Sequence, residues 1–268
     1  MRFGFCASPD RAAALKAAGY DYLEGHLFNL SQKTDAEVAE WRRMLADAGM
    51  RAEAFNCCFP WNWQLVGETP VSEAEISDYC ARAFARAASL GAEVIVLGSG
   101  RCRSIPEGQD FPLSRARAQF VRAARLVGDA ARREGLRIAL EPLRRQETAF
   151  IHTLTEGYEL VREIDHPAVR LLADFYHVAQ LDEPLSDVPA VADALIHCHI
   201  AHPVTRAVPA PGDDAGAFYA GALRALSRVG YRGRLSVEAN AHADRWESEM
   251  TDALAALRAA LAAASRMG

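Results

Sequence analysis

Short apolar segments alternate with longer amphipathic segments from one end of the chain to the other. The short segments are bounded by polar residues or glycine, which is typical of strands buried on both faces of a parallel sheet. They cover residues 2–6, 20–27, 51–56, 93–98, 137–143, 169–174, 194–200 and 234–239. The pattern therefore predicts eight buried strands.

Between these segments, the spacing of the apolar residues predicts helices. They cover residues 9–18, 35–48, 72–90, 112–134, 154–164, 215–229 and 243–264. Ala, Leu, Arg and Glu dominate these stretches, and all four residue types favour helix. Glycine follows several of them, for example Gly19 and Gly91. A helix often ends at a glycine in the left-handed conformation, so we expect the helices to end there.

Alternation of strands and helices with short connections predicts an α/β protein, a single (β/α)8 TIM barrel. The length of 268 residues agrees, because such a barrel commonly needs about 250. A doubly wound open sheet is the alternative. It usually has a glycine-rich turn after the first strand, and residues 6–10 contain no glycine. Since we find no linker rich in proline or serine, we expect one domain over residues 1–268.

Composition narrows the functional class. Half of the residues are hydrophobic, which is enough for a large core. The net charge is −5 and there is no run of Lys or Arg, which disfavours a nucleic-acid partner. The chain begins as a strand, with no signal peptide and no segment long enough to span a bilayer, so we expect a cytoplasmic protein with no membrane partner. The six cysteines form no C-x-x-C pair, and we expect them to be reduced.

The last four predicted strands each end on an acidic or imidazole side chain: Glu141, Asp174, His199 and Glu238. In such barrels the active site lies where the strands end. One carboxylate at such a place is usually a loop cap or an ion-pair partner. Four ionisable groups on consecutive strands of an apolar barrel need pairing or a cation. We therefore predict one divalent metal ion, with Mn²⁺ preferred and Mg²⁺, Co²⁺ and Zn²⁺ also compatible with this ligand set.

Neighbouring residues are candidates for supporting roles. His197 shares a strand face with His199 but lies one layer deeper, so we expect a core residue or a partner of the ligand. His177 follows Asp174 by three residues and would reach the site from the loop to bind a substrate oxygen. Glu147 either covers the site or is a solvated loop carboxylate.

Residues from the early loops are further candidates. Trp61, Asn62, Trp63 and His26 would close the pocket over a substrate, since aromatic rings pack well on sugar C–H groups. Trp61 and Trp63 are equally suited to covering an oligomer interface, so a homo-oligomer stays open. Glu24 ends the second strand, where it would hydrogen-bond the substrate or pair with an arginine.

The motifs at residues 141–147, 174–177, 197–201 and 237–238 resemble those of the xylose-isomerase-like sugar isomerase/epimerase superfamily. The motifs are closest to those of ketose 3-epimerases and related keto-sugar epimerases. The resemblance runs through most of the chain and is most specific between residues 141 and 238. Two departures bear on the substrate: Arg144-Arg145 replaces a frequent Asn-Arg, and His202 replaces a frequent acid.

The resemblance implies roles for particular residues. It implies that one divalent metal is bound by Glu141, Asp174, His199 and Glu238. The two glutamates are also implied to be the catalytic acid/base pair. Contacts to substrate hydroxyls are implied for Glu147, His177 and Arg206.

Together these observations predict a metal-dependent sugar isomerase or epimerase of carbohydrate metabolism. It would transfer a proton at the carbon next to a carbonyl through a metal-stabilised enediolate, with a keto-sugar as its small-molecule partner. One alternative is a metal-dependent lyase or dehydratase that acts on a keto-sugar or keto-polyol at the same site. Another is a non-catalytic sugar-binding subunit. A phosphoesterase of the endonuclease IV type is disfavoured. Such an enzyme needs several more histidine ligands for a metal cluster and a basic surface that faces DNA, whereas this chain has eight histidines and a net charge of −5.

Overall fold

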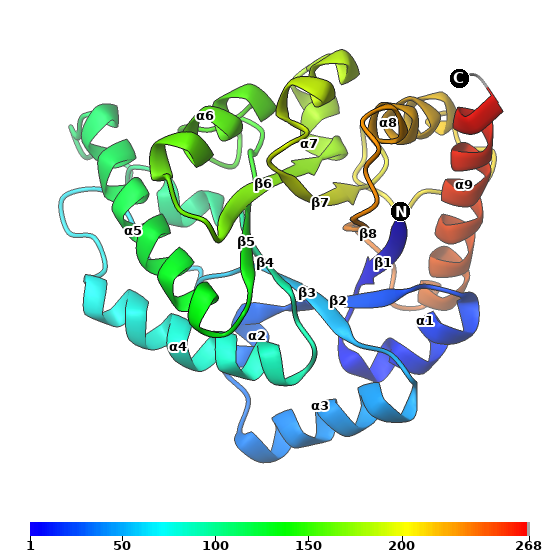
Figure 1. Ribbon diagram of the computed structural model, residues 1–268, viewed down its shortest axis with the longest axis horizontal. Coiled ribbons are helices and arrows are strands. Elements are labelled where there is room, and N and C mark those ends of the chain that lie inside the picture. The colour runs from blue at the N-terminus through cyan, green and yellow to red at the C-terminus, as the bar shows by residue number, and fades with distance from the viewer. Residues whose placement is uncertain (267–268) are drawn as a thin grey trace.

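Eight parallel strands close into a barrel in sequence order (Figure 1). The computed structural model describes residues 1–266. The strands are β1 (Arg2–Cys6), β2 (Tyr22–His26), β3 (Ala52–Asn56), β4 (Val94–Leu97), β5 (Arg137–Leu140), β6 (Val169–Asp174), β7 (Leu195–Ile200) and β8 (Arg234–Val237). Strand β8 pairs with β1, where Val237 lies opposite Phe5, and this pairing closes the barrel. The predicted (β/α)8 barrel is confirmed.

Helices surround the barrel on its outside (Figure 1). The α-helices are α1 (Ala12–Ala18), α2 (Leu27–Ser31), α3 (Asp35–Asp47), α4 (Glu73–Ser89), α5 (Leu113–Arg133), α6 (Leu154–Ile164), α7 (Phe175–Gln180), α8 (Gly216–Arg228) and α9 (Trp246–Arg266). The 3₁₀ segments are η1 (Pro9–Arg11), η2 (Gly100–Arg103) and η3 (Leu185–Val191). As predicted, the helices α1 and α4 are followed by left-handed glycines, Gly19 with φ +96° and Gly91 with φ +94°. Within residues 1–266, no helix is both long and apolar enough to cross a bilayer.

Two short helices that the sequence pattern did not predict begin directly at the ends of strands. Helix α2 follows His26, whose Nδ1 accepts a hydrogen bond from the Asn29 amide at 3.2 Å. Helix α7 follows Asp174, whose Oδ1 accepts one from the Tyr176 amide at 2.8 Å. Each cap uses a side chain that stands at the barrel mouth, so these helices hold His26 and Asp174 in place.

The interior of the barrel is layered. At the end where the strands begin, Glu53 lies 2.6 Å from Arg2 and 2.8 Å from Arg234. An apolar layer follows, formed by Tyr22, Ala54, Val94, Val96, Ala139 and Leu172. Buried polar residues occupy the layers nearer the mouth, beginning with His197. The apolar layer therefore separates a structural ion-pair network from the polar groups at the mouth.

Candidate functional site

The four side chains predicted to bind a metal, Glu141, Asp174, His199 and Glu238, lie together at the barrel mouth. We call these four side chains the metal group. Glu141 follows β5, Asp174 ends β6, His199 lies in β7 and Glu238 follows β8. Each offers one nitrogen or oxygen atom, and these atoms lie within 4.8 Å of one another. Glu141, Asp174 and His199 are buried, and Glu238 is partly exposed toward the cavity above. Parallel pairing in sequence order brings these ends together, because consecutive strands end at the same rim.

Charge in this group is unbalanced. Nδ1 of His199 lies 3.2 Å from Glu141 and 3.5 Å from Glu238. Burial raises the pKa of Glu141 above its usual range, and it raises the pKa of Asp174 to about 6, with the Glu238 charge adding to both shifts. Burial lowers the pKa of His199, but the surrounding carboxylates outweigh it and hold that pKa well above its usual range. The carboxylates therefore form a concentration of negative charge that a cation would relieve.

Several buried polar atoms within residues 1–266 have no hydrogen-bond partner, and two of them lie beside the predicted ligand atoms. These two are Oδ2 of Asp174 and Nε2 of His177, which lie 3.5 Å apart. The other oxygen of Asp174 is already used by the Tyr176 amide. Buried polar groups are normally satisfied, so an unpaired carboxylate oxygen within a cluster of ligand atoms is what a metal site would show without its ion. Three carboxylates and one imidazole fit a divalent cation.

The predicted substrate-binding residues lie close to this group. Arg206 Nη2 lies 2.7 Å from Glu238 Oε2, and Nη1 lies 3.4 Å from Glu147 Oε1. Glu147 also accepts a hydrogen bond from Arg144 Nε at 2.8 Å, so it is an ion-paired residue and not a freely solvated one. His177 receives the Arg144 amide on Nδ1 at 3.4 Å. A cavity of about 170 Å³ is lined by Glu141, Glu238, Glu147, Arg206 and Trp61, among others.

The early-loop residues occupy different places. Trp61 is 58% exposed and lines the cavity above the metal group. His26 lies beside it, with 6.5 Å between the ring centroids, but lines a neighbouring cavity. Trp63 stacks on Phe59 with 5.6 Å between centroids and packs against the core. Trp63 therefore closes neither cavity, contrary to one of the two expectations for it.

Of the two expectations for Glu24, the pairing with an arginine is wrong. Its carboxylate pairs with two buried histidines instead of an arginine: Oε2 lies 2.8 Å from His197 Nε2, and Oε1 lies 3.0 Å from His199 Nε2. Burial raises the pKa of Glu24, but the two histidines outweigh it and hold the pKa well below its usual range. Two histidines on one inward strand face imply a buried partner, and that signal could have pointed to Glu24.

Two further residues support the metal group and were not predicted to. Asn56, at the end of β3, donates a hydrogen bond from Nδ2 to Glu238 Oε1 at 2.8 Å. Arg103 is completely buried and donates from Nη1 to the backbone oxygen of Glu141 at 3.0 Å. Asn56 therefore holds Glu238, and Arg103 holds the backbone at Glu141.

Comparisons with known proteins agree with this description. A family model described as xylose isomerase-like TIM barrel matches residues 12–260. A probable ketose 3-epimerase of Synechocystis sp. is 27% identical over 124 residues, which is 46% of this chain and 42% of the relative. An L-ribulose 3-epimerase of Methylomonas sp. is 27% identical over 232 residues, 84% of this chain and 76% of the relative. A 3-dehydroshikimate dehydratase of Pseudomonas putida is 27% identical over 247 residues, 86% of this chain but 35% of the relative.

Among solved structures, a D-psicose 3-epimerase crystallised in the presence of D-fructose has the same fold. It superposes with a TM-score of 0.84 and 20% sequence identity, over 97% of this chain and 99% of that chain. At this level of identity, the likeness concerns the architecture of the barrel.

Proposed function

This chain belongs to the xylose isomerase-like TIM-barrel family, and we propose that it is a divalent-metal-dependent epimerase of a keto-sugar. The observation that carries the proposal is the convergence of Glu141 and Glu238 on one group of ligand atoms with Asp174 and His199. The names of two relatives, a probable ketose 3-epimerase and an L-ribulose 3-epimerase, support the choice of substrate class.

The four converging residues would hold the metal, with Mn²⁺ preferred. When bound there, a divalent cation would stabilise the negative charge that develops on the substrate oxygens as a proton leaves the neighbouring carbon. The proton next to a ketone is only weakly acidic, which is why such a reaction needs this stabilisation. Binding should also relieve the crowding of carboxylates around Asp174.

Glu141 and Glu238 would move the proton. They follow β5 and β8, three strands apart in the barrel order, and so approach the small cavity from different sides. One carboxylate can remove a proton from one face of a carbon while the other returns a proton to the opposite face. Removal on one face and return on the other inverts the carbon, which is epimerisation.

Glu147, His177 and Arg206 would bind substrate hydroxyls. Arg206 holds Glu238 and Glu147 together from above and can donate to a sugar oxygen at the same time. Nε2 of His177 is buried without a partner and is available for a substrate oxygen. Trp61 would cover the cavity and pack on the C–H groups of the sugar. His26 would contribute from the adjoining wall.

The test measures exchange of the substrate's carbon-bound proton with the solvent. D-Fructose, D-tagatose and L-ribulose are incubated with the protein and Mn²⁺ in deuterated water, and NMR records deuterium at carbon together with each product. Glu141→Gln and Glu238→Gln keep the size and one ligand oxygen but remove the basic carboxylate, so turnover should fall at least about 10²-fold. One of the two variants should still exchange the proton without inversion. Near wild-type inversion by both variants would eliminate the two-face mechanism.

Metal dependence has its own measurement. The purified protein should hold about one divalent ion per chain by elemental analysis, and Asp174→Ala should lower the occupancy. Chelation should abolish exchange, and Mn²⁺ should restore it. Full activity after exhaustive removal of metal would rule out this part of the proposal.

A dehydratase is the second candidate, and the similarity to 3-dehydroshikimate dehydratase favours its consideration. It would use the same metal group and base, but its product would lose a hydroxyl group as water. The same NMR experiment separates the two candidates, because an epimer keeps every hydroxyl. Binding of a sugar with no exchange and no product would instead indicate a sugar-binding subunit.

A further inference from the structure

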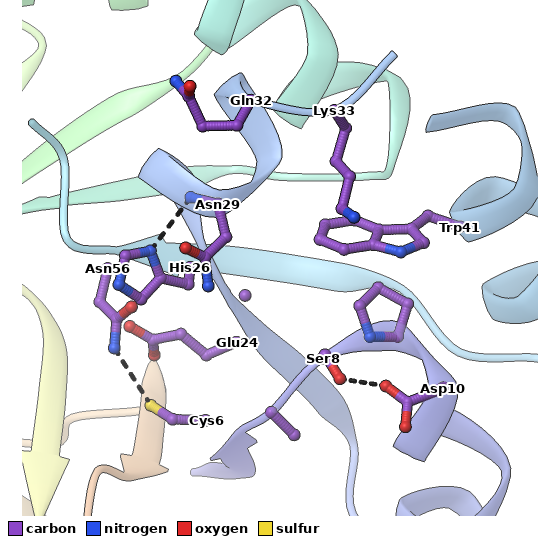
Figure 2. Close-up of a pocket in the computed structure, with 13 residues that line it drawn as sticks. Cys6, Ser8, Asp10, Glu24, His26, Asn29, Gln32, Lys33, Trp41 and Asn56 are labelled. Carbon is purple, nitrogen blue, oxygen red and sulfur yellow. Dashed lines mark hydrogen bonds between the residues drawn. The ribbon is translucent and has the colours of Figure 1, made fainter. Parts of the chain in front are cut away.

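A larger cavity lies beside the metal group, between the loops that follow β1 and β2 (Figure 2). Its volume is about 650 Å³, whereas the cavity above the metal group has about 170 Å³. Asn56 lines both, donating to Glu238 Oε1 at 2.8 Å and to Cys6 Sγ at 3.6 Å. We call the larger one the β1–β2 cavity. Of these two cavities, the larger has a volume in the range of about 300–1,000 Å³ typical of ligand pockets.

The barrel order gives the direction in which a substrate would extend. Glu147, His177 and Arg206 follow β5, β6 and β7, so in the proposed function they would hold the reacting end of the substrate on that side of the mouth. In a closed barrel of eight strands, β1 and β2 lie across the mouth from β5 and β6. The end of the substrate remote from these residues would then point toward the β1–β2 cavity.

Little uncompensated charge faces this cavity. At its inner end, Glu24 is already paired with His197 and His199. Farther out, the Lys33 ammonium lies 2.8 Å from Glu37. Among the described residues that line the cavity, Lys33 is the one Lys or Arg, and its pairing with Glu37 means that the lining favours a neutral group over a phosphate or carboxylate.

The outer walls carry groups that suit a sugar ring. Asn29 supplies an amide on one wall and Asp10 a carboxylate on another (Figure 2). Trp41 supplies an aromatic ring, with Lys33 Nζ 5.6 Å from its centroid. In Figure 2, Lys33 lies on one side of this ring, and Ser8 and Asp10 lie across the cavity on the other. An aromatic surface combined with hydrogen-bonding side chains matches a polyhydroxylated ring, which has apolar C–H faces and hydroxyl edges.

We propose that the β1–β2 cavity binds a second sugar ring, attached to the end of the substrate remote from the keto carbon. This inference rests on the proposed function. It makes keto-disaccharides the preferred substrate class over free ketoses. Contacts with the part of a substrate that does not react are used to hold the reacting carbon in place, so they raise kcat/KM.

The test compares D-fructose with isomaltulose, which is fructose carrying glucose on O6, far from the reacting carbons. Deuterium exchange at carbon is measured with the Mn²⁺-loaded protein. The kcat/KM for isomaltulose should exceed that for D-fructose at least tenfold. Maltulose and lactulose, which carry the second ring on O4, extend the series. If none of the three disaccharides exceeds D-fructose, the second-ring site is refuted while the proposed function stands.

Two variants test whether the higher kcat/KM for the disaccharide arises from the β1–β2 cavity. Trp41→Ala and Asn29→Ala should remove most of the advantage of the disaccharide and leave exchange of D-fructose unchanged. Phe111→Ala is the matched control, because Phe111 is a half-buried aromatic residue that lines neither cavity. An equal loss for both sugars in Trp41→Ala and Asn29→Ala would overturn the proposal.

A binding measurement that needs no turnover separates failure of the proposed function from failure of the second-ring site. Isothermal titration of isomaltulose into the wild-type protein and into Trp41→Ala reports on the cavity alone. If neither sugar exchanges but isomaltulose binds in a manner that depends on Trp41, the proposed function fails and the sugar site stands. If isomaltulose binds equally to both proteins, or to neither, the sugar site fails.

Discussion

Glu24 and His199 are joined by a hydrogen bond of 3.0 Å between Oε1 and Nε2, and both side chains are completely buried. The other ring nitrogen of His199 faces Glu141 and Glu238. When Nε2 carries the proton that Glu24 accepts, the lone pair of Nδ1 points into the metal group. A carboxylate that orients a metal-binding histidine in this way is typical of protein metal sites.

Glu24→Gln should therefore weaken metal binding about 10- to 100-fold, because an amide group holds Nε2–H of His199 less firmly than a carboxylate does. Calorimetric titration of Mn²⁺ into metal-free protein measures the change. Glu53→Gln is the matched control, since Glu53 is a buried carboxylate paired with arginines at the opposite end of the barrel. Equal losses in the two variants would show that any disturbed barrel carboxylate lowers the affinity, and would contradict the role of Glu24.

A side chain at Gly98 should displace the carboxylate of Glu141, because a Cβ atom there would overlap Oε2 of Glu141. In Gly98→Ala the carboxylate must move away from its place among the ligand atoms. We expect at least a tenfold loss of Mn²⁺ affinity, measured by titration, since removal or displacement of a ligand weakens a site strongly. Gly216→Ala is the control, because a Cβ at that position meets no atom within 4 Å. Unchanged affinity in Gly98→Ala would place Glu141 outside the metal group.

His177→Ala should separate substrate binding from metal binding. His177 lies beside Asp174 but is not one of the four residues whose ligand atoms converge. We expect kcat/KM to fall at least about tenfold, the cost of a lost hydrogen bond to a substrate, while the metal content stays near that of the wild type. His199→Ala should instead lose the metal. The reverse result, with metal lost only from His177→Ala, would exchange the roles of the two histidines.

Glu183 should make folding stability depend on pH. Its Oε1 accepts a hydrogen bond from the Leu154 amide at 2.8 Å at the start of α6, and burial raises its pKa to about 7. The folded state therefore binds a proton that the unfolded state releases near pH 4.5. This contribution favours folding at low pH, and it is lost progressively as the pH rises from about 4.5 to about 7.

Glu183→Gln removes this titration and keeps an oxygen for the Leu154 amide. The free energy of unfolding of the variant, compared with that of the wild type, should rise between pH 5 and pH 8. The expected change is on the order of 1 kcal/mol, because partial exposure screens the effect. Urea unfolding at the two pH values provides the measurement. The exposed Glu68→Gln serves as control, and a difference independent of pH in Glu183→Gln would contradict the assignment.

The local pattern of apolar and polar residues was enough to predict most of the helices and strands. The predicted bounds of β6 and α6 agree with Val169–Asp174 and Leu154–Ile164 in the structure. Helices and strands differ in the period of their apolar residues, and that period is readable in a segment of several turns or several alternations. Helices α2 and α7 contain five and six residues, too few for a helical period to show. They were missed for this reason, although both begin at residues of the mouth.

Strand order also made the convergence of four polar side chains predictable from the sequence. Once eight parallel strands follow one another around a barrel, the side chains at their ends must share one rim, so Glu141, Asp174, His199 and Glu238 could be grouped without coordinates. The prediction needed only the chain order and the polarity of the strand ends.

The partner of each buried polar group was decided by the tertiary structure. Glu24 and His199 are 175 positions apart, and Asn56 and Glu238 are 182 apart. They meet because the pairing of β8 with β1 closes the barrel and brings early and late strands to the same interior. The β1–β2 cavity depends on the same closure. Sequence determined which residues stand at the mouth, whereas closure of the barrel determined which charges neutralise one another there, because Coulomb energy depends on distance through space.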